Sequence, residues 1–190
     1  MSKRDLIQSA VFIVTVGIIL FLLRQFVFTP MIVKGNSMDP TLHNKERVIA
    51  LKLEKVKRYD IVTFSAPDAP GKNYIKRVIG LPGDDVKYTD DVLYINGKIY
   101  QEPYLESEKA KTLDEEPLTG DFTLEKLFGS SKVPEGKVFV MGDNRRVSKD
   151  SRIIGYIDES KILGVVRFAF WPFEDFGPIS NIQEDEQTNN

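Results

Sequence analysis

A serine and a lysine, each in a distinctive local setting, are the residues of this chain best suited to act together. Ser37 lies in the segment GNSMDPTL, residues 35–42. Within it, Gly35 lets the backbone approach another molecule closely, and Pro40 stiffens the turn that leaves the serine. A serine hydroxyl is a weak nucleophile until a base removes its proton, and a neutral lysine amine can act as that base.

Lys76 is the candidate base. It lies in YIKRVIGLPGD, residues 74–84, where the alternation of a strand puts Lys76 on the same face as Val78. A free lysine has a pKa of about 10.4, and full burial lowers that pKa by roughly 3–5 units, which makes the neutral amine available near pH 7. The alternative interpretation is a lysine that snorkels to solvent from an edge strand, and the residues alone leave it open.

The only histidine, His43, offers a second way to activate the serine. A Ser-His mechanism also needs a carboxylate that orients the imidazole, and Glu46 or Asp39 would have to supply it. Groups so close in sequence rarely form a triad, so we interpret His43 as an ordinary surface or turn residue.

The composition excludes several classes of protein. The chain has 190 residues, which is room for one domain plus an anchor. Without cysteine and with one histidine, neither a disulfide framework nor a transition-metal site is expected, and we expect no cofactor. A net charge of -2 argues against nucleic acid as a partner. One run is locally basic, and we interpret it as solvated strand faces, with contact to anionic lipid as the alternative. This run comprises Lys45, Arg47, Lys52, Lys55, Lys57 and Arg58.

Residues 6–23 carry no charge and are long enough to span a bilayer core of about 30 Å, so they predict a transmembrane anchor. Lys3 and Arg4 precede the segment, which places residues 1–5 in the cytoplasm and the rest outside the cell. A cleaved signal peptide is the alternative, but the segment is long and lacks small residues at a cleavage position. A soluble core helix would show one apolar stripe instead of an apolar surface all round. Together with Ser37 and Lys76, the anchor indicates a membrane-anchored serine protease.

Beyond the anchor, residues 24–172 form short β-type runs separated by turns and predict an all-β, barrel-like or sandwich domain. Asn96-Gly97 between two such runs predicts a type I′ hairpin. The charged stretch 102–134 is interpreted as an insertion or mobile loop with a short helix within 118–129. Residues 173–190 are predicted to be a tail, disordered over 183–190. The predicted strands cover residues 31–33, 47–53, 60–65, 74–81, 85–89, 92–95, 98–100, 137–141 and 162–170.

Two further segments carry a resemblance. Residues 142–152 read GDNRRVSKDSR and residues 58–64 read RYDIVTF. With the Ser37 and Lys76 segments, in this order and spacing, the chain resembles the bacterial type I signal peptidases from the anchor to about residue 172, as a compact member. The resemblance implies an enzyme that cuts signal peptides from exported preproteins with a Ser/Lys dyad at the outer membrane face. It implies Ser37 as nucleophile, Lys76 as general base and Ser148 as the hydroxyl that orients the lysine. It also implies supporting roles for Asp143, Asn144, Asp150 and Arg152.

The resemblance also implies a substrate strand bound over shallow apolar pockets suited to small residues such as alanine. By motif position these are lined by Met31, Val33, Gly35, Met38, Leu42, Tyr74 and Ile75, although the apolar members among them can equally be core. Larger members carry a serine at the position of Gly35, so the oxyanion is expected to rely on main-chain donors. The pair Arg146-Val147 replaces commonly polar or acidic residues and is expected to be tolerated in a loop.

Two other functions fit the same residues. The nearest is a protease that cuts itself with a Ser/Lys dyad, as the self-cleaving repressors do. Those repressors carry a DNA-binding domain, and none is visible in this sequence. A membrane-tethered β-domain that binds ligands without catalysis is the alternative from another class.

Overall fold

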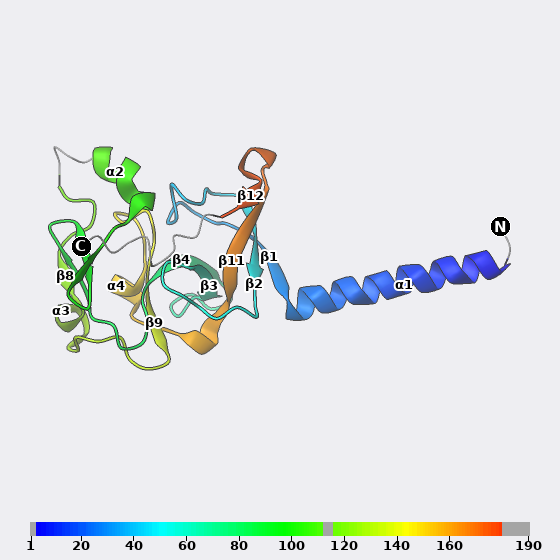
Figure 1. Ribbon diagram of the computed structural model, residues 1–190, viewed down its shortest axis with the longest axis horizontal. Coiled ribbons are helices and arrows are strands. Elements are labelled where there is room, and N and C mark those ends of the chain that lie inside the picture. The colour runs from blue at the N-terminus through cyan, green and yellow to red at the C-terminus, as the bar shows by residue number, and fades with distance from the viewer. Residues whose placement is uncertain (1–2, 112–115, 180–190) are drawn as a thin grey trace.

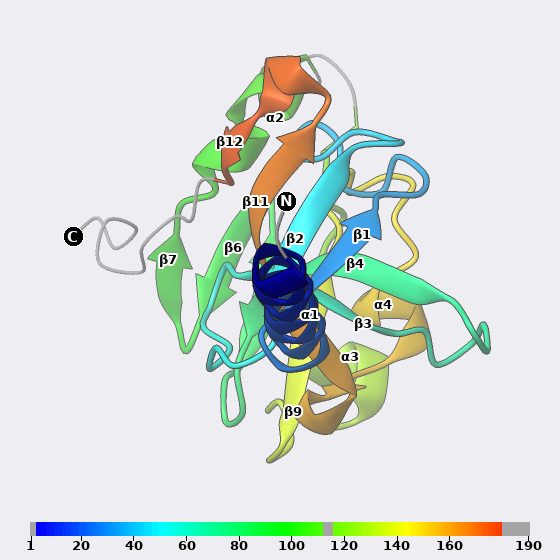
Figure 2. The same ribbon diagram turned by 90° about the vertical axis from the view of Figure 1, so that its right-hand side faces the viewer.

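The computed structural model describes residues 3–111 and 116–179, and its longest element is the N-terminal helix α1, Lys3–Phe26. The helix extends away from the β-rich part of the molecule (Figures 1 and 2). None of its residues is buried, because nothing in the described chain packs over the helix. Its exposed side chains are apolar on every face. The apolar helix predicted over 6–23 is confirmed, with about one more turn at each end.

The larger sheet contains eight strands. Seven of them lie in the order β1-β2-β11-β3-β4-β9-β10, and the eighth, β12, pairs with the C-terminal half of β11. All of its pairings are antiparallel, and β1 and β10 are its two edges within the described residues. The sheet therefore stays open and is not a closed barrel. Its strands are β1 Phe28–Ile32, β2 Arg47–Leu51, β3 Ile61–Ser65, β4 Asn73–Gly80, β9 Lys137–Met141, β10 Ile157–Asp158, β11 Ile162–Trp171 and β12 Gly177–Pro178.

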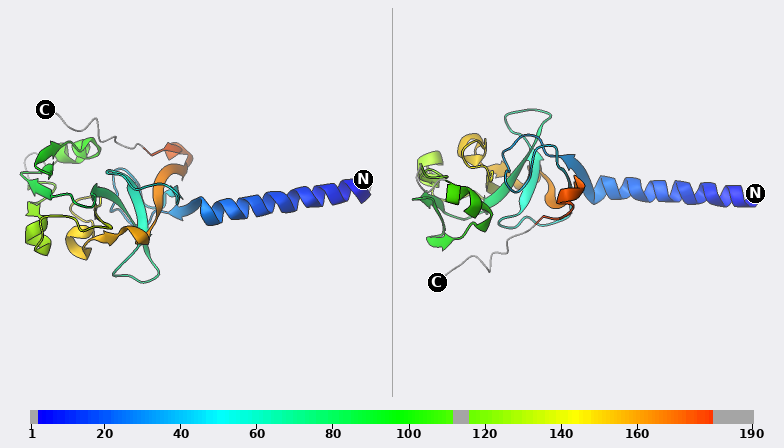
Figure 3. Two further views of the ribbon diagram at one scale, coloured as in Figure 1. Left: turned by 60° about the horizontal axis from the view of Figure 1, so that its bottom comes forward. Right: turned by 90° about the horizontal axis from the view of Figure 1, so that it is seen from above.

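The smaller sheet has the order β7-β6-β5-β8 and lies at the end of the molecule farthest from α1 (Figures 1 and 3). Its strands are β5 Val86–Thr89, β6 Val92–Ile95, β7 Lys98–Tyr100 and β8 Phe122–Thr123. Asn96 and Gly97 both have positive φ, of 52° and 79°, as a type I′ turn requires, so the predicted hairpin is confirmed. Of the predicted all-β, barrel-like or sandwich domain, the predominance of β-strands is confirmed, but short helices are also present and the larger sheet is not a closed barrel.

The described residues of the stretch after the hairpin form regular elements that pack on the core, so the mobile-loop alternative is wrong for them, whereas the insertion stays a prediction. Leu105, Phe122 and Leu124 are buried, so the segment packs against the core. The helix expected within 118–129 is present as α3, Leu124–Phe128. The other helical elements are η1 Pro103–Leu105, α2 Glu106–Lys111, α4 Ser151–Ile154, η2 Glu159–Lys161 and η3 Phe173–Asp175.

The folded part also continues past the predicted start of the tail at residue 173. After η3, the short strand β12 pairs with β11 through Phe168 opposite Pro178 and Ala169 opposite Gly177. The segment predicted to be disordered, 183–190, lies outside the described residues.

The junction of helix and sheet is held by a lysine of the basic run. Lys52 Nζ donates hydrogen bonds to the carbonyl oxygens of Arg24 and Gln25, at 3.3 and 2.7 Å, near the C-terminal end of α1. These carbonyls have no partner further along the helix, and a cation near this end is favourable. The other members of the run are exposed as expected, except Arg58, which is buried and paired with Asp84.

Phe139 of β9 is central to the core between the two sheets. It is fully buried and stacks near Phe122, Phe128 and Tyr156, with ring centroids 5.7–6.3 Å apart. Large aromatic side chains at such a junction stabilise the fold through the apolar surface that they remove from water and through close packing.

We expect Phe139→Ala to lower the free energy of unfolding by about 3–5 kcal/mol, because the change leaves a cavity that its rigid neighbours cannot fill. Urea unfolding of the full chain in detergent, followed by circular dichroism, measures this. The matched control is Phe173→Ala, whose side chain is 75% exposed and whose loss should change stability by no more than about 0.5 kcal/mol. Equal effects of the two changes would contradict this account of the core.

Candidate active site

Ser37 lies in the turn that connects β1 to β2, and buried side chains hold this turn in place. Met38 and Leu42, which both follow Ser37, are 1% and 0% exposed, and they pack into an apolar cluster with Val33 and Ile75. The amide of Gly35 donates to Asn44 Oδ1 at 3.0 Å, and Gly35 has a φ of 83°, which a residue with a Cβ adopts at a cost. The serine is therefore carried on a fixed turn with its hydroxyl half-buried.

Lys76 is on β4, where it pairs with Val62 of β3, and it is only 3% exposed. Burial lowers the pKa of Lys76 from 10.5 to about 8, while the carboxylates of Asp150 and Asp143 act in the opposite direction. Removal from water disfavours the charged ammonium form, so the neutral amine becomes accessible close to physiological pH. The inward orientation predicted for this lysine is confirmed.

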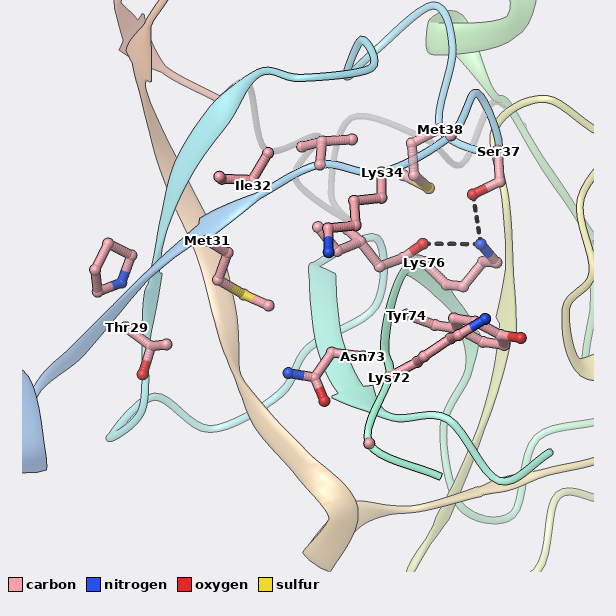
Figure 4. Close-up of a pocket in the computed structure, with 15 residues that line it drawn as sticks. Thr29, Met31, Ile32, Lys34, Ser37, Met38, Lys72, Asn73, Tyr74 and Lys76 are labelled. Carbon is pink, nitrogen blue, oxygen red and sulfur yellow. Dashed lines mark hydrogen bonds between the residues drawn. The ribbon is translucent and has the colours of Figure 1, made fainter. Parts of the chain in front are cut away.

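The two side chains meet at hydrogen-bond distance (Figure 4). Lys76 Nζ lies 2.6 Å from Ser37 Oγ, and it also donates to the carbonyl oxygen of Ile75 at 3.0 Å. A neutral amine that uses one N–H on Ile75 keeps a lone pair that can accept the serine proton. The geometry required of a nucleophile and its base is therefore present.

Gly142 is the point where the loop after β9 touches the dyad. A Cβ at this position would overlap both the carbonyl oxygen of Ser37 and the hydroxyl of Ser148. The neighbouring amide of Asn144 donates to the same Ser37 carbonyl at 3.2 Å. Only glycine leaves room for the loop and the serine turn to lie this close.

Two ion pairs hold this loop. Arg77, next to Lys76 on β4, binds Asp143 through both carboxylate oxygens at 2.9 and 2.6 Å, and both side chains are buried. Arg152 binds Asp150 in the same bidentate way, and Asp150 also accepts the amide of Gly142 at 3.0 Å. Such paired contacts fix orientation as well as position. Asp150 is fully buried, so it is not part of an ordinary surface ion pair.

Of two further groups, Ser148 lies differently from expectation, whereas His43 is the surface residue that was predicted. The hydroxyl of Ser148 is buried beside Gly142 but has no hydrogen-bond partner among the described residues, so the bond to Lys76 that was expected of it is not formed here. His43 is exposed and its Nδ1 lies 2.9 Å from Asp39, whereas Ser37 Oγ is paired with the lysine. The histidine interpretation of the base is therefore not supported.

An open groove of about 670 Å³ leads to the dyad between β1 and the first half of β4. β1 is a sheet edge, and β4 pairs with β9 only from Arg77 onward. Residues 73–76 of β4 therefore turn an unpaired backbone edge toward the groove. One end of the groove begins at Thr29, three residues after the end of α1.

Most of the predicted substrate contacts line this groove: Met31, Val33, Gly35, Met38, Tyr74 and Ile75. Leu42 does not; it is fully buried in the core, so its assignment as a substrate contact is corrected to a packing role. Sequence reasoning missed Lys34, Lys72 and Asn73, which also line the groove (Figure 4). In the described residues, no group of three or more His, Cys, Asp or Glu side chains is placed to hold a metal ion.

The comparison with protein families bears directly on this site. Residues 6–171 match the family described as signal peptidase, peptidase S26. The chain belongs to this family. It is therefore a serine endopeptidase by family, and the resemblance seen in the four motifs is confirmed.

Relatives of this S26 peptidase match over most of its length. A protein of Bacillus caldolyticus described as signal peptidase I is 48% identical over 158 residues, covering 81% of this chain and 85% of the relative. A signal peptidase IB of Staphylococcus aureus (strain Mu50) is 43% identical over 182 residues, covering 92% and 94%. The crystal structure of a signal peptidase I from Enterococcus faecalis V583 superposes with a TM-score of 0.57 at 47% identity, covering 59% of this chain and 97% of that one.

We expect Gly142→Ala to lower the endopeptidase activity of this S26 peptidase by about 100-fold or more, since displacement of a catalytic group by about 1 Å is enough for such a loss. Peptide-bond cleavage by the folded full-length protein in detergent measures it. The control is Gly177→Ala, where an added Cβ meets no atom within 4 Å and activity should be unchanged. Normal activity of Gly142→Ala would show that the close approach of the loop is dispensable.

Proposed function

We propose that this chain is a membrane-anchored peptidase that removes signal peptides from exported preproteins, with Ser37 as nucleophile and Lys76 as general base. The observation that carries the proposal is the 2.6 Å contact between Ser37 Oγ and the buried Nζ of Lys76 at the end of an open groove. The family match supports signal peptides as the substrate class, and the relatives described as signal peptidase I and IB act as precedents.

The reaction follows from the two side chains. Neutral Lys76 takes the hydroxyl proton of Ser37 while Oγ attacks the carbonyl carbon of the scissile bond, so that the carbonyl oxygen becomes an oxyanion. The lysine then gives its proton to the departing amine, the C–N bond breaks, and an acyl-enzyme ester remains. A water molecule deprotonated by the same lysine attacks the ester, which releases the signal peptide as a carboxylic acid and restores Ser37.

The oxyanion needs hydrogen-bond donors fixed in advance, and each one contributes roughly 2.7–4 kcal/mol in other enzymes. The amide of Gly35 already donates to Asn44 Oδ1, so it is committed to the turn. We assign the donor role to the backbone N–H of Ser37, which is carried by the turn that Met38 and Leu42 anchor.

The groove suits an extended substrate. Residues 73–76 of β4 pair with β3 on one edge, and their other edge, which β9 does not reach, faces the free edge of β1. A peptide strand can form main-chain hydrogen bonds with such edges. Alternate side chains of that strand would face the apolar floor formed by Met31, Val33 and Ile75. The floor is shallow because Val33 and Ile75 are themselves packed into the core, which favours small residues such as alanine next to the cleaved bond.

The helix α1 supplies the anchor. Its 24 residues correspond to about 36 Å at 1.5 Å per residue, enough for a hydrocarbon core of about 30 Å. Lys3 and Arg4 at its start favour a cytoplasmic N-terminus, which puts the β-rich domain outside the cell. The groove then opens close to the membrane surface, where a signal peptide leaves the bilayer.

We expect Ser37→Ala to abolish cleavage of an added preprotein and Lys76→Met to slow it by at least about 100-fold, because a positioned general base contributes on that scale. The measurement is release of the mature protein, followed by electrophoresis. His43→Ala is the control and should cleave at the wild-type rate, since this side chain is exposed and paired with Asp39. A non-catalytic tether predicts no cleavage even by the wild type, and a self-cleaving protein predicts cutting of its own chain with the preprotein left intact.

The rate should rise with pH. Because the neutral amine is the active form and the pKa of Lys76 is about 8, kcat/KM should fall about tenfold per pH unit well below pH 8 and level off above it. The profile is measured on a preprotein, with circular dichroism at each pH to check that the fold is retained. A rising limb centred near pH 10 would indicate an exposed, ordinary lysine and would exclude a buried base.

A further inference from the structure

Arg145 lies outside the dyad and yet is one of the most completely satisfied side chains in the described chain. It is 2% exposed, and its guanidinium contacts the hydroxyls of Tyr88, Tyr104 and Thr119 and the carboxylate of Glu102. All four partners belong to the small sheet or to the segments that follow it, whereas Arg145 belongs to the loop after β9. The guanidinium therefore ties the small sheet to the loop that touches Ser37.

Glu102 is the charge that holds this guanidinium. Its side chain is 1% exposed; one carboxylate oxygen binds Arg145 Nη2 and accepts from Tyr104 at 2.7 Å, and the other accepts from Tyr88. Burial raises the pKa of Glu102, but the charge and hydrogen bond of Arg145, together with the hydrogen bonds of Tyr88 and Tyr104, outweigh it, so the pKa lies below its ordinary value. The carboxylate is thus ionised, and without its charge Arg145 would be a buried cation with no anion in contact.

From Arg145 the contacts lead to the catalytic serine in two steps. Arg145 Nε donates to the carbonyl oxygen of Gly142 at 3.1 Å, on the opposite side of the residue from the amide that Asp150 holds. Gly142 in turn lies against the Ser37 carbonyl and the Ser148 hydroxyl, closer than any side chain would allow. A rotation of the Gly142 peptide would therefore displace both Ser37 and Ser148.

Tyr104 joins the same cluster to the strand that carries the base. Its ring lies 3.9 Å from the guanidinium carbon of Arg77 and 6.0 Å from that of Arg145, while its hydroxyl donates to Glu102. Arg77 follows Lys76 directly and binds Asp143 of the loop. The contacts that position Ser37 and Lys76 therefore depend on Glu102 and Tyr104, two residues that lie outside the four motifs.

We propose that Glu102 is a positioning residue of the peptidase, acting through Arg145 to fix the Gly142 peptide and with it the geometry of Ser37 and Lys76. This inference rests on the proposed function of the dyad and extends the active site to the small sheet. The sheet then holds the loop in place without contacting the substrate, since none of its residues lines the groove.

The test is Glu102→Gln in the full-length protein in detergent, with kcat and KM measured on a preprotein that carries alanine before the cleavage site. We expect kcat per folded molecule to fall on the order of 10- to 100-fold, while KM changes by less than about twofold, because the groove is not altered. We also expect the rising limb of the pH profile to move to higher pH, because a loosened loop admits water to Lys76. A purely structural role would lower the folded fraction and leave both kcat per folded molecule and the pH midpoint unchanged.

The matched control is Asp84→Asn, which removes the charge from another buried carboxylate. Asp84 is paired with Arg58 at 2.8 Å where the small sheet begins, and it also accepts hydrogen bonds from the Leu81 amide and the Asn96 side chain, all outside the loop 142–148. The variant should lose stability and keep kcat. Wild-type kcat in Glu102→Gln, or an equal fall in Asp84→Asn, would overturn the proposal while Ser37-dependent cleavage still stood. Absence of any Ser37-dependent cleavage would instead remove the proposed function and this inference with it.

A double-mutant cycle identifies the route. If Glu102 acts through Arg145, the double variant Glu102→Gln/Arg145→Met should be no slower than Arg145→Met alone, whereas additive losses would contradict the route. Should these variants fail to fold, Tyr88→Phe keeps the ring and removes only the hydroxyl between Arg145 and Glu102. It should lower kcat in the same direction by less, and an unchanged kcat would overturn the proposal.

Discussion

The structure depends on keeping one amine out of water beside one hydroxyl. Lys76 is only 3% exposed, and desolvation is the largest influence on its pKa. Two carboxylates nearby, Asp150 and Asp143, work against that effect, so the site cannot tolerate them as free anions. Each is bound by an arginine and hydrogen-bonded to its surroundings, which limits how strongly it stabilises the ammonium form.

Strand β4 explains how distant segments converge on this amine. Consecutive residues of a strand point to opposite faces, so Lys76 and Arg77 have different principal partners. The lysine meets the serine turn, and the arginine meets Asp143 in the loop after β9. One strand thus supplies the base and also fastens the segment that packs against the nucleophile.

The features set by local residues were predictable, and those set by long-range packing were not. The apolar helix and the Asn96-Gly97 hairpin follow from composition and turn chemistry. The pairing of Ser37 with Lys76 is the exception, a long-range contact that was expected from the order of the motifs and their resemblance to a family. The segment after the hairpin reads as charged and irregular because its elements are short and owe their order to tertiary contacts. Glu102 looks like any surface acid in the sequence, and only the fold reveals its buried partner. Leu42 could belong to the core or to the pocket, and its complete burial in the fold assigns it to the core.

The lysine that binds the last carbonyls of α1 has a consequence for where a substrate is cut. Lys52 belongs to β2, the neighbour of the strand that forms one wall of the groove, so α1 and the active site are joined without a slack linker. If α1 is the membrane anchor proposed above, the height of Ser37 above the bilayer is set by the protein and not by the substrate. In that arrangement the chain acts as a ruler, and a substrate must end its apolar stretch at a matching level to present its cleavage site.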